Sequence, residues 1–206
     1  MTDEDFLYFL NAFGPQIERR EVPPSSIERY RTRLPNKMLE YWQEFGWAGY
    51  AEGLFWIVNP QEYEAILDEW LSGSVFEARD TFHVIAMGAF GELYVWGELF
   101  GYCFSIASPE SCLVPQTNFS EPSRDMDFDI RCFFLARERA HEDTYELFTE
   151  AYSRLGKLKL GENYGFRLAP ILGGAIDANN LDKVSSVEYL TFLAQLEELS
   201  ILNVTD

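Results

Sequence analysis

The stretch that most constrains the fold of this chain covers residues 81–114, where apolar residues stop following a helical period and gather in short runs. These runs are rich in strand-forming residues and predict three strands, Phe82–Met87, Glu92–Trp96 and Tyr102–Ile106. Gly91 and Gly101 lie in the connections, and glycine readily adopts the positive φ that tight hairpins need. The stretch therefore predicts a small antiparallel β-meander.

Amphipathic helices are predicted on both sides of this meander. A helix after Pro35 places Met38, Leu39, Trp42 and Phe45 on one face. The apolar run 54–58 predicts a buried strand, and Asn59-Pro60 then supplies a cap and a first-turn proline for the next helix. In that helix the apolar residues repeat at helical spacing, at Tyr63, Ile66, Leu67, Trp70 and Leu71. The predicted fold class is α+β, an antiparallel meander packed with amphipathic helices.

A polar segment divides the chain into two predicted modules. Residues 109–124 are rich in Ser, Pro and Asn, as a linker would be. The prediction is an N-terminal module at 1–108 and a C-terminal module at 125–206. Because the linker between them is short, we expect the two modules to form one compact body. In the second module we expect helices over 127–139 and 143–155, and then an irregular glycine-rich segment.

The charge of the chain is strongly negative and unevenly placed. The formal net charge is −18. Residues 38–123 hold thirteen acidic residues and one basic residue, Arg79, which leaves −12 in that stretch. Clustered acids are compatible with a merely soluble surface, but they also attract a basic partner and speed its association. Nucleic acids and anionic membranes need a basic footprint, so direct binding to either is disfavoured.

The composition also indicates a reducing compartment. The three cysteines are too few and too scattered for a disulfide framework or a zinc site. The N-terminus is acidic where a signal peptide would be basic, and no apolar run approaches the ~20 residues of a membrane span. A cytoplasmic protein is the expectation.

Chemistry-bearing motifs are not found in the sequence. His83 and His141 are the two histidines, and neither has partners at metal-ligand spacing. Acid pairs such as Glu197-Glu198 are explained by solvation on a polar helix face, and Gly173-Gly174 is explained by a tight bend beside packed aromatic residues. We therefore expect no catalytic residues, no metal and no cofactor, and the protein is not predicted to be an enzyme.

Two long patterns resemble known families. The first pattern resembles the GAD-like domain. It consists of the run Leu34-Pro35…Tyr41-Trp42…Phe45-Gly46-Trp47-Ala48-Gly49-Tyr50…Leu54-Phe55-Trp56-Ile57-Val58-Asn59-Pro60…Trp70-Leu71, continued by Ala89-Phe90-Gly91-Glu92-Leu93-Tyr94-Val95-Trp96-Gly97. The second pattern is similar to the C-terminal domain of type VI secretion immunity proteins. It consists of the run Leu155-Gly156…Tyr164-Gly165-Phe166…Pro170…Leu172-Gly173-Gly174…Asn180-Leu181…Glu188-Tyr189-Leu190. Tyr189 stands where this second pattern has histidine.

The resemblance implies a cytoplasmic immunity protein that binds and neutralises a co-inherited antibacterial effector, typically a DNase. A DNase must present a basic cleft to DNA, so an acidic protein can cover that cleft. The expected partner-binding residues are aromatic residues of a loop at 46–53 and nearby acids: Trp47, Tyr50, Glu52, Glu62, Asp68, Glu69, Glu92 and Glu98. For the two aromatic residues, packing over the neighbouring strand is the alternative.

Two other functions remain open from the sequence. An acidic adaptor or chaperone would bind an effector without inhibiting it, and a stoichiometric inhibition assay separates that role from immunity. An enzyme with an unrecognised site would need a deep polar pocket with convergent titratable groups.

Overall fold

The computed structural model describes residues 3–117 and 119–202. Its helices are α1 (Glu4–Phe13), α2 (Pro24–Tyr30), α3 (Asn36–Phe45), α4 (Glu64–Leu71), α5 (Met126–Leu135), α6 (Arg139–Glu142), α7 (Phe148–Leu155) and α8 (Ser186–Ala194). Its strands are β1 (Ile17–Arg20), β2 (Trp47–Tyr50), β3 (Phe55–Ile57), β4 (Phe82–Gly88), β5 (Leu93–Gly97), β6 (Gly101–Ala107), β7 (Cys112–Pro115), β8 (Glu162–Phe166), β9 (Leu181–Ser185) and β10 (Ser200–Ile201).

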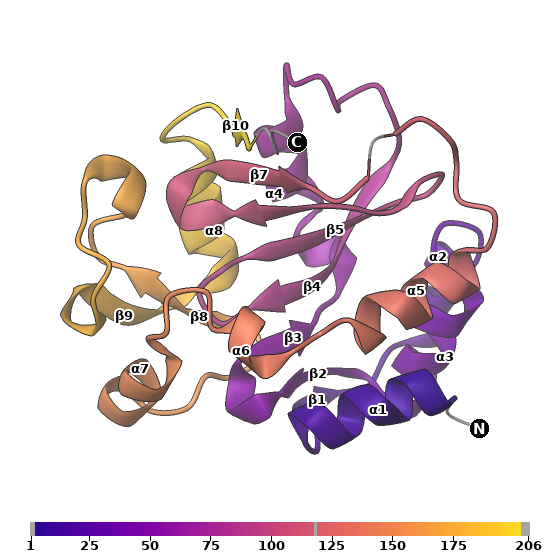
Figure 1. The fold of residues 1–206 in the computed structure, drawn as a ribbon, viewed down its shortest axis with the longest axis horizontal. Coiled ribbons are helices and arrows are strands. Elements are labelled where there is room, and N and C mark those ends of the chain that lie inside the picture. Colours follow the sequence, from indigo (N-terminus) through magenta and orange to yellow (C-terminus); the bar gives the residue numbers. More distant parts are fainter. Residues whose placement is uncertain (1–2, 118, 203–206) are drawn as a thin grey trace.

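Within these residues a large sheet has the order β1-β2-β3-β4-β5-β6-β7-β10, and β8 and β9 form a separate pair (Figure 1). Neighbouring strands of the large sheet are antiparallel except β7 and β10, which are parallel. The predicted meander is its centre, β4-β5-β6, and the turn glycines Gly91 and Gly101 have φ values of 90° and 76°. The α+β prediction is confirmed.

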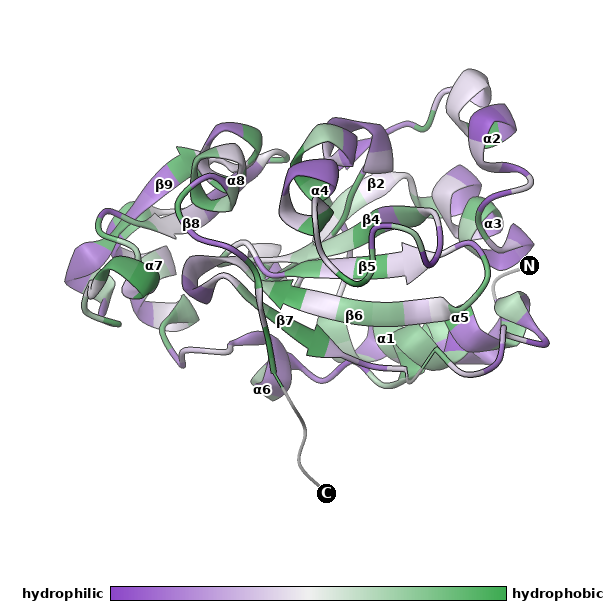
Figure 2. Cartoon of the chain, turned by 90° about the horizontal axis from the view of Figure 1, so that it is seen from above, coloured by the Kyte–Doolittle hydropathy of each residue, from purple (hydrophilic) through white to green (hydrophobic). Residues whose placement is uncertain are grey.

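Helices cover both faces of the large sheet (Figure 2). Helices α4 and α8 lie side by side on one face, whereas α1 and α5 pack together on the other. The core between these layers is strongly aromatic. Phe6, Phe9 and Phe134, for example, come from α1 and α5 and meet with ring centroids 4.9–5.4 Å apart. Such contacts join the first helix to the segment that follows the predicted linker.

The chain on either side of the predicted linker shares this sheet and core, so the expectation of one compact body is confirmed. Strand β10 from the C-terminal region pairs with β7, and α5 packs on α1 and α3. Residues 112–115 of the predicted linker form strand β7 rather than a free connection. The division at 108 and 125 stays a prediction.

Several local expectations are wrong. The predicted loop 46–53 contains strand β2, in which all four residues are buried. The expected irregular segment after residue 161 begins with strand β8, paired to β9. The helix expected over 127–139 ends at Leu135, and α7 begins only at Phe148.

Candidate partner-binding surface

The two aromatic residues expected at the interface are buried in the core of the folded chain. Trp47 and Tyr50 are 2% and 0% exposed. Trp47 packs edge-on against Trp42 at 5.6 Å, and Tyr50 packs against Phe9 at 5.0 Å. Their positions in β2, which pairs with both β1 and β3, place them under helices rather than in a loop. Packing over the neighbouring strand, the alternative interpretation, describes them correctly.

Three of the predicted acids are exposed or half-exposed but already have a cation or histidine partner. Glu52 binds Arg139 at 2.6 Å, and Glu62 binds Arg20 at 2.7 Å. Glu98 contacts Nε2 of the buried His83 at 2.9 Å. Their local charge is therefore partly compensated within the chain.

Glu92 belongs to a largely buried polar cluster on the α6 side of the sheet. The Tyr94 hydroxyl lies 3.2 Å from Glu92 Oε2 and hydrogen-bonds with Glu142 Oε2. The guanidinium of Arg137 lies 3.4 Å from Glu142 and stacks over the rings of Tyr94 and Phe133. Burial raises the pKa of Glu142 to about 7, against the lowering effect of Arg137, and burial also raises the pKa of Glu92. This cluster attaches α6 to the sheet.

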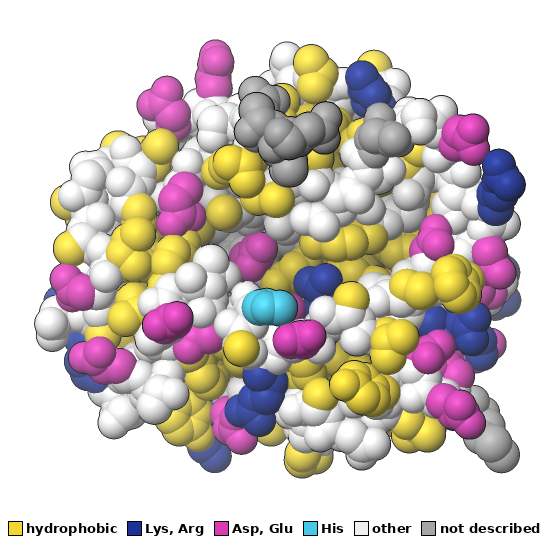
Figure 3. Space-filling model, viewed as in Figure 1, with side chains coloured by type: hydrophobic (Ala, Val, Ile, Leu, Met, Phe, Trp, Pro, Cys, Tyr) yellow, Lys and Arg dark blue, Asp and Glu magenta, His cyan; other side chains and the backbone are white. Residues whose placement is uncertain are grey.

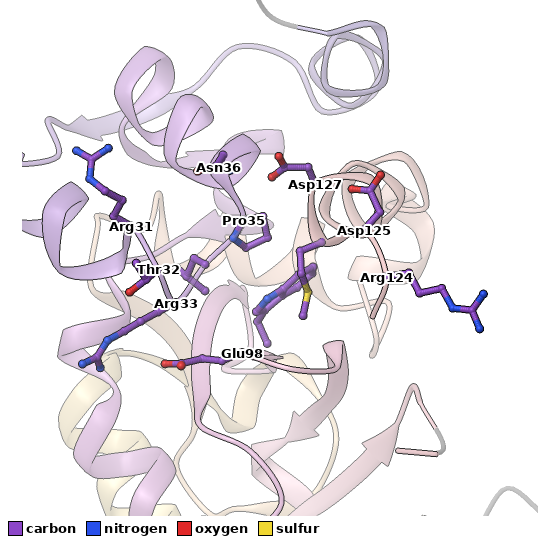
Figure 4. A pocket seen from close by; sticks show the side chains of 12 residues that line it. Arg31, Thr32, Arg33, Pro35, Asn36, Glu98, Arg124, Asp125 and Asp127 are labelled. Carbon is purple, nitrogen blue, oxygen red and sulfur yellow. The ribbon is translucent and has the colours of Figure 1, made fainter. Parts of the chain in front are cut away.

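Glu98 lines a hollow of about 340 Å³ between the α2–α3 connection and the start of α5 (Figure 4). Its charges are mixed, and Arg31 and Arg124 point away from it. They pair instead with Glu28 and Glu121. This hollow concentrates neither one charge nor a set of convergent catalytic groups.

The predicted acids are consequently dispersed. Glu92 and Glu98 flank the two ends of β5, so about 20 Å of strand length separates them. Asp68 and Glu69 differ from the other predicted acids, because both are exposed and have no ion pair in the part of the chain that the structure describes. They lie on α4.

Glu69 lines the largest of the described hollows, a groove of about 730 Å³ between the ends of α4 and α8. We call this the α4–α8 groove. Its charged residues are all acidic: Glu69, Glu197 and Glu198. Each of the three is exposed and, in residues 3–117 and 119–202, without an ion pair. Trp70, Val75, Leu196 and Ile201 add apolar surface.

The ends of two helices add to the negative potential of the groove. Helix α4 ends at Leu71 and α8 ends at Ala194, and the residues that follow each end, Ser72 and Gln195, line the groove. The C-terminal end of a helix carries a partial negative charge that a Lys or Arg commonly balances. Neither last turn contains a basic residue. The groove therefore has a negative electrostatic potential, which attracts cationic groups.

Glu197 and Glu198 were missed by the sequence interpretation, which assigned them to a solvated face. They are solvated, but they follow the end of α8 and face the acidic α4 across the groove. The sequence signal that could have indicated them is a pair of consecutive acids just after α8, a helix whose last turn contains no basic residue.

The opposite face of the molecule has a different charge pattern. On the face that carries α1 and α5, acidic and basic side chains are interspersed, and hydrophobic side chains surround a central hollow (Figure 3). Within the described residues, no group of three or more His, Cys, Asp or Glu could hold a metal ion. No helix among them is long and apolar enough to cross a membrane.

Two family models match the chain that carries this groove. The model of the GAD-like domain matches residues 4–110, just over half of the chain. The chain belongs to the GAD-like domain family. A second model, the C-terminal domain of the T6SS immunity protein Tdi1, matches residues 127–197. The resemblances stated from the sequence are thus confirmed. The second match supports an immunity function, in which a protein inhibits its effector and is not an enzyme.

Structural comparison supports the fold of the whole GAD-like protein. It matches the crystal structure of Atu4351 from Agrobacterium tumefaciens with a TM-score of 0.83. The match covers 98% of this chain and 93% of that chain at 22% sequence identity. Comparison with curated proteins gives no match. The Tyr189 hydroxyl accepts a hydrogen bond from the Phe166 amide at 3.0 Å.

Proposed function

We propose that this immunity protein neutralises a type VI secretion effector with DNase activity, by covering the basic DNA-binding cleft of the effector with an acidic surface centred on the α4–α8 groove. The partner is a basic protein, and binding takes place in the cytoplasm, without direct contact to nucleic acid or membrane. The observation that carries the proposal is the uncompensated acidic lining of this groove.

The chemistry of a DNase supports this partner. An enzyme that cleaves DNA binds phosphates through Lys and Arg, and its cleft is positive before DNA arrives. The α4–α8 groove offers carboxylates and two helix C-terminal ends to the same cations. A protein docked there competes for the charge and blocks access to the active site.

The groove also narrows the set of acids that the sequence suggested. Asp68 and Glu69 remain candidate contacts, because they are exposed and unpaired in the described structure. Glu197 and Glu198 join them from the C-terminal module. Both parts of the chain therefore contribute to one surface.

Charge reversal tests this proposal. The variant Glu69→Lys/Glu197→Lys/Glu198→Lys changes the groove charge by six, and reversal at true contacts costs several kcal/mol of binding. We expect loss of inhibition when the purified effector digests DNA in the presence of equimolar immunity protein. The matched control, Glu21→Lys/Glu44→Lys/Glu150→Lys, changes the net charge equally at exposed acids away from the groove, and should inhibit like the wild type.

The outcomes separate the alternatives. Full inhibition by the folded groove variant would reject the groove as the contact surface. An effector that does not cleave DNA would reject the DNase assignment. Tight binding without inhibition would favour an adaptor or chaperone.

A further inference from the structure

A short loop in the C-terminal module exposes an unusual amount of apolar surface. Four large aliphatic side chains within nine residues are exposed: Leu168 48%, Ile171 36%, Leu172 50% and Ile176 52%. We call residues 168–176 the aliphatic loop. It follows β8 and projects at the edge of the molecule, in orange at the left of Figure 1. The largest apolar patch on a typical monomer covers about 300–600 Å² and often has a function.

The loop is held in one conformation by the side chain of Asn180. Its Oδ1 accepts from the Leu168 amide at 3.1 Å, and its Nδ2 donates to the carbonyls of Leu168 and Ala175, both at 2.8 Å. Asp177 in turn accepts from the backbone amide of Asn180 at 3.2 Å. One residue thus ties both ends of the loop together.

The two glycines of the loop complete this construction. Gly173 has a φ of +83°, which other residues rarely adopt. Gly174 leaves no room for a side chain, since a Cβ there would lie 1.8 Å from the Leu168 carbonyl oxygen. The amide of Gly174 also donates to the Ala169 carbonyl at 3.1 Å. The tight bend expected for this glycine pair exists, but it presents aliphatic side chains to solvent instead of lying beside packed aromatic residues.

A rigid loop that displays aliphatic side chains has already lost the conformational freedom that binding would otherwise remove. We propose that the aliphatic loop is a preformed hydrophobic anchor that inserts into an apolar pocket of the effector, as a second contact in addition to the acidic α4–α8 groove. This inference rests on the proposed function, because the effector is taken as the partner. The groove determines how fast the effector is captured, and the loop determines how long it stays bound.

Shape and area argue against a second copy of this chain as the occupant. The loop is a protrusion, and in a two-fold contact it would have to bury itself against an identical protrusion. Three hollows in the described part of the chain, of about 730, 380 and 340 Å³, all have charged residues in their lining, so none of them is a purely apolar pocket for an aliphatic side chain. A stable interface buries about 800 Å² on each partner. Four half-exposed aliphatic side chains supply on the order of 300 Å², so a partner that also engages the groove fits better.

The test is the variant Leu172→Ser/Ile176→Ser, which removes apolar surface from exposed positions without opening the core. The probe is the purified effector, rendered catalytically inactive, and binding is followed by surface-based kinetics. We expect the dissociation rate constant to rise about 100-fold, because anchor residues carry most of the binding energy. The association rate constant should stay within a factor of about three. The control Leu99→Ser/Leu135→Ser changes two aliphatic residues of similar exposure elsewhere and should bind like the wild type.

Three outcomes would overturn the anchor. The first is unchanged dissociation of the loop variant while the wild type binds and inhibits, which leaves the proposed function intact. The second is a dimeric wild type that becomes monomeric in the loop variant by sedimentation velocity, which assigns the loop to a second copy. The third is a wild type that does not bind the effector, in which case the proposed function fails as well.

Discussion

Gly49 is a residue at which one methyl group decides whether two strands can pack. It lies in β2 opposite Trp56 of β3, and a Cβ at this position would lie 2.8 Å from carbons of the Trp56 ring. The ring is buried and its indole donates to the Gly53 carbonyl at 2.8 Å, so it cannot move aside easily. Overpacking of this kind costs about 1–3 kcal/mol.

We therefore expect Gly49→Ala to lower the free energy of unfolding by about 1–3 kcal/mol, measured by urea denaturation. Gly88→Ala is the matched control, because a Cβ there meets its nearest neighbour, Glu92 Cβ, at 3.4 Å. Equal stability of the two variants would show that the Trp56 ring has room to shift.

Glu142 is the residue whose ionisation should make stability depend on pH. Burial raises its pKa from 4.5 to about 7. A carboxyl with a raised pKa in the folded state contributes its full stability below about pH 4.5, and this contribution is lost as the pH rises towards 7. Arg137, Tyr94 and Glu92 are the polar groups around it.

In the variant Glu142→Gln the side chain at position 142 cannot ionise, so its contribution to stability is not lost as the pH rises. Between pH 4.5 and 7.5 we expect its unfolding free energy to fall less steeply than that of the wild type, by up to about 3 kcal/mol over the range. Glu92 and Glu110, whose pKa values burial also raises, should leave a residual slope. The control is Glu138→Gln at an exposed position nearby. Parallel pH profiles for wild type and Glu142→Gln would show that Glu142 is ionised throughout.

At the scale of elements, the aliphatic loop depends on contacts with Asn180. In the variant Asn180→Ala three side-chain hydrogen bonds to the loop backbone are lost, which should cost about 1–2 kcal/mol of local stability. We expect the Leu168 amide to exchange about 10-fold faster or more in native-state hydrogen exchange, with strands β4 and β5 unchanged. Asn179→Ala is the control, because the backbone amide of Asn179 bonds to Asp177 and its side chain makes no hydrogen bond to any residue that the structure describes. Unaltered exchange at Leu168 would contradict the role of Asn180.

Elements were predictable from the sequence where one face is apolar and the other polar. Helices α3 and α4 follow such patterns. The strands of the meander β4-β5-β6 are buried on both faces and were predictable instead as short apolar runs rich in strand-forming residues, with glycines at the turns. Strand β2 was not predictable in either way, because its sequence Trp-Ala-Gly-Tyr shows no alternation and half of it is Ala and Gly, which are poor strand formers. Strand β8 has a similar burial, and the neighbouring glycines suggested an irregular segment instead.

At the scale of the whole molecule, the net charge was evident from the sequence, but its distribution over the surface was not. Whether an acid is available to a partner depends on contacts distant in sequence. Arg139, for example, lies 87 residues from Glu52 and binds it, whereas Glu69 has no such partner among the described residues. The groove joins α4 with the end of α8, and this proximity exists only in the folded chain.

The unbalanced charge should make capture of the effector depend on salt. Opposite charges steer association, and salt screens them over a Debye length of about 10 Å at 0.1 M. We expect the association rate constant of wild type and effector to fall about 10-fold or more between 0.03 M and 0.5 M NaCl, and dissociation to change much less.

In the variant Glu69→Gln/Glu197→Gln/Glu198→Gln the logarithm of the association rate should vary less steeply with ionic strength, because the groove no longer attracts the basic cleft. The neutralised control Glu21→Gln/Glu44→Gln/Glu150→Gln has the same net charge and should keep most of the wild-type slope. Equal slopes for the two triple variants would mean that steering comes from the total charge of −18 and not from the groove.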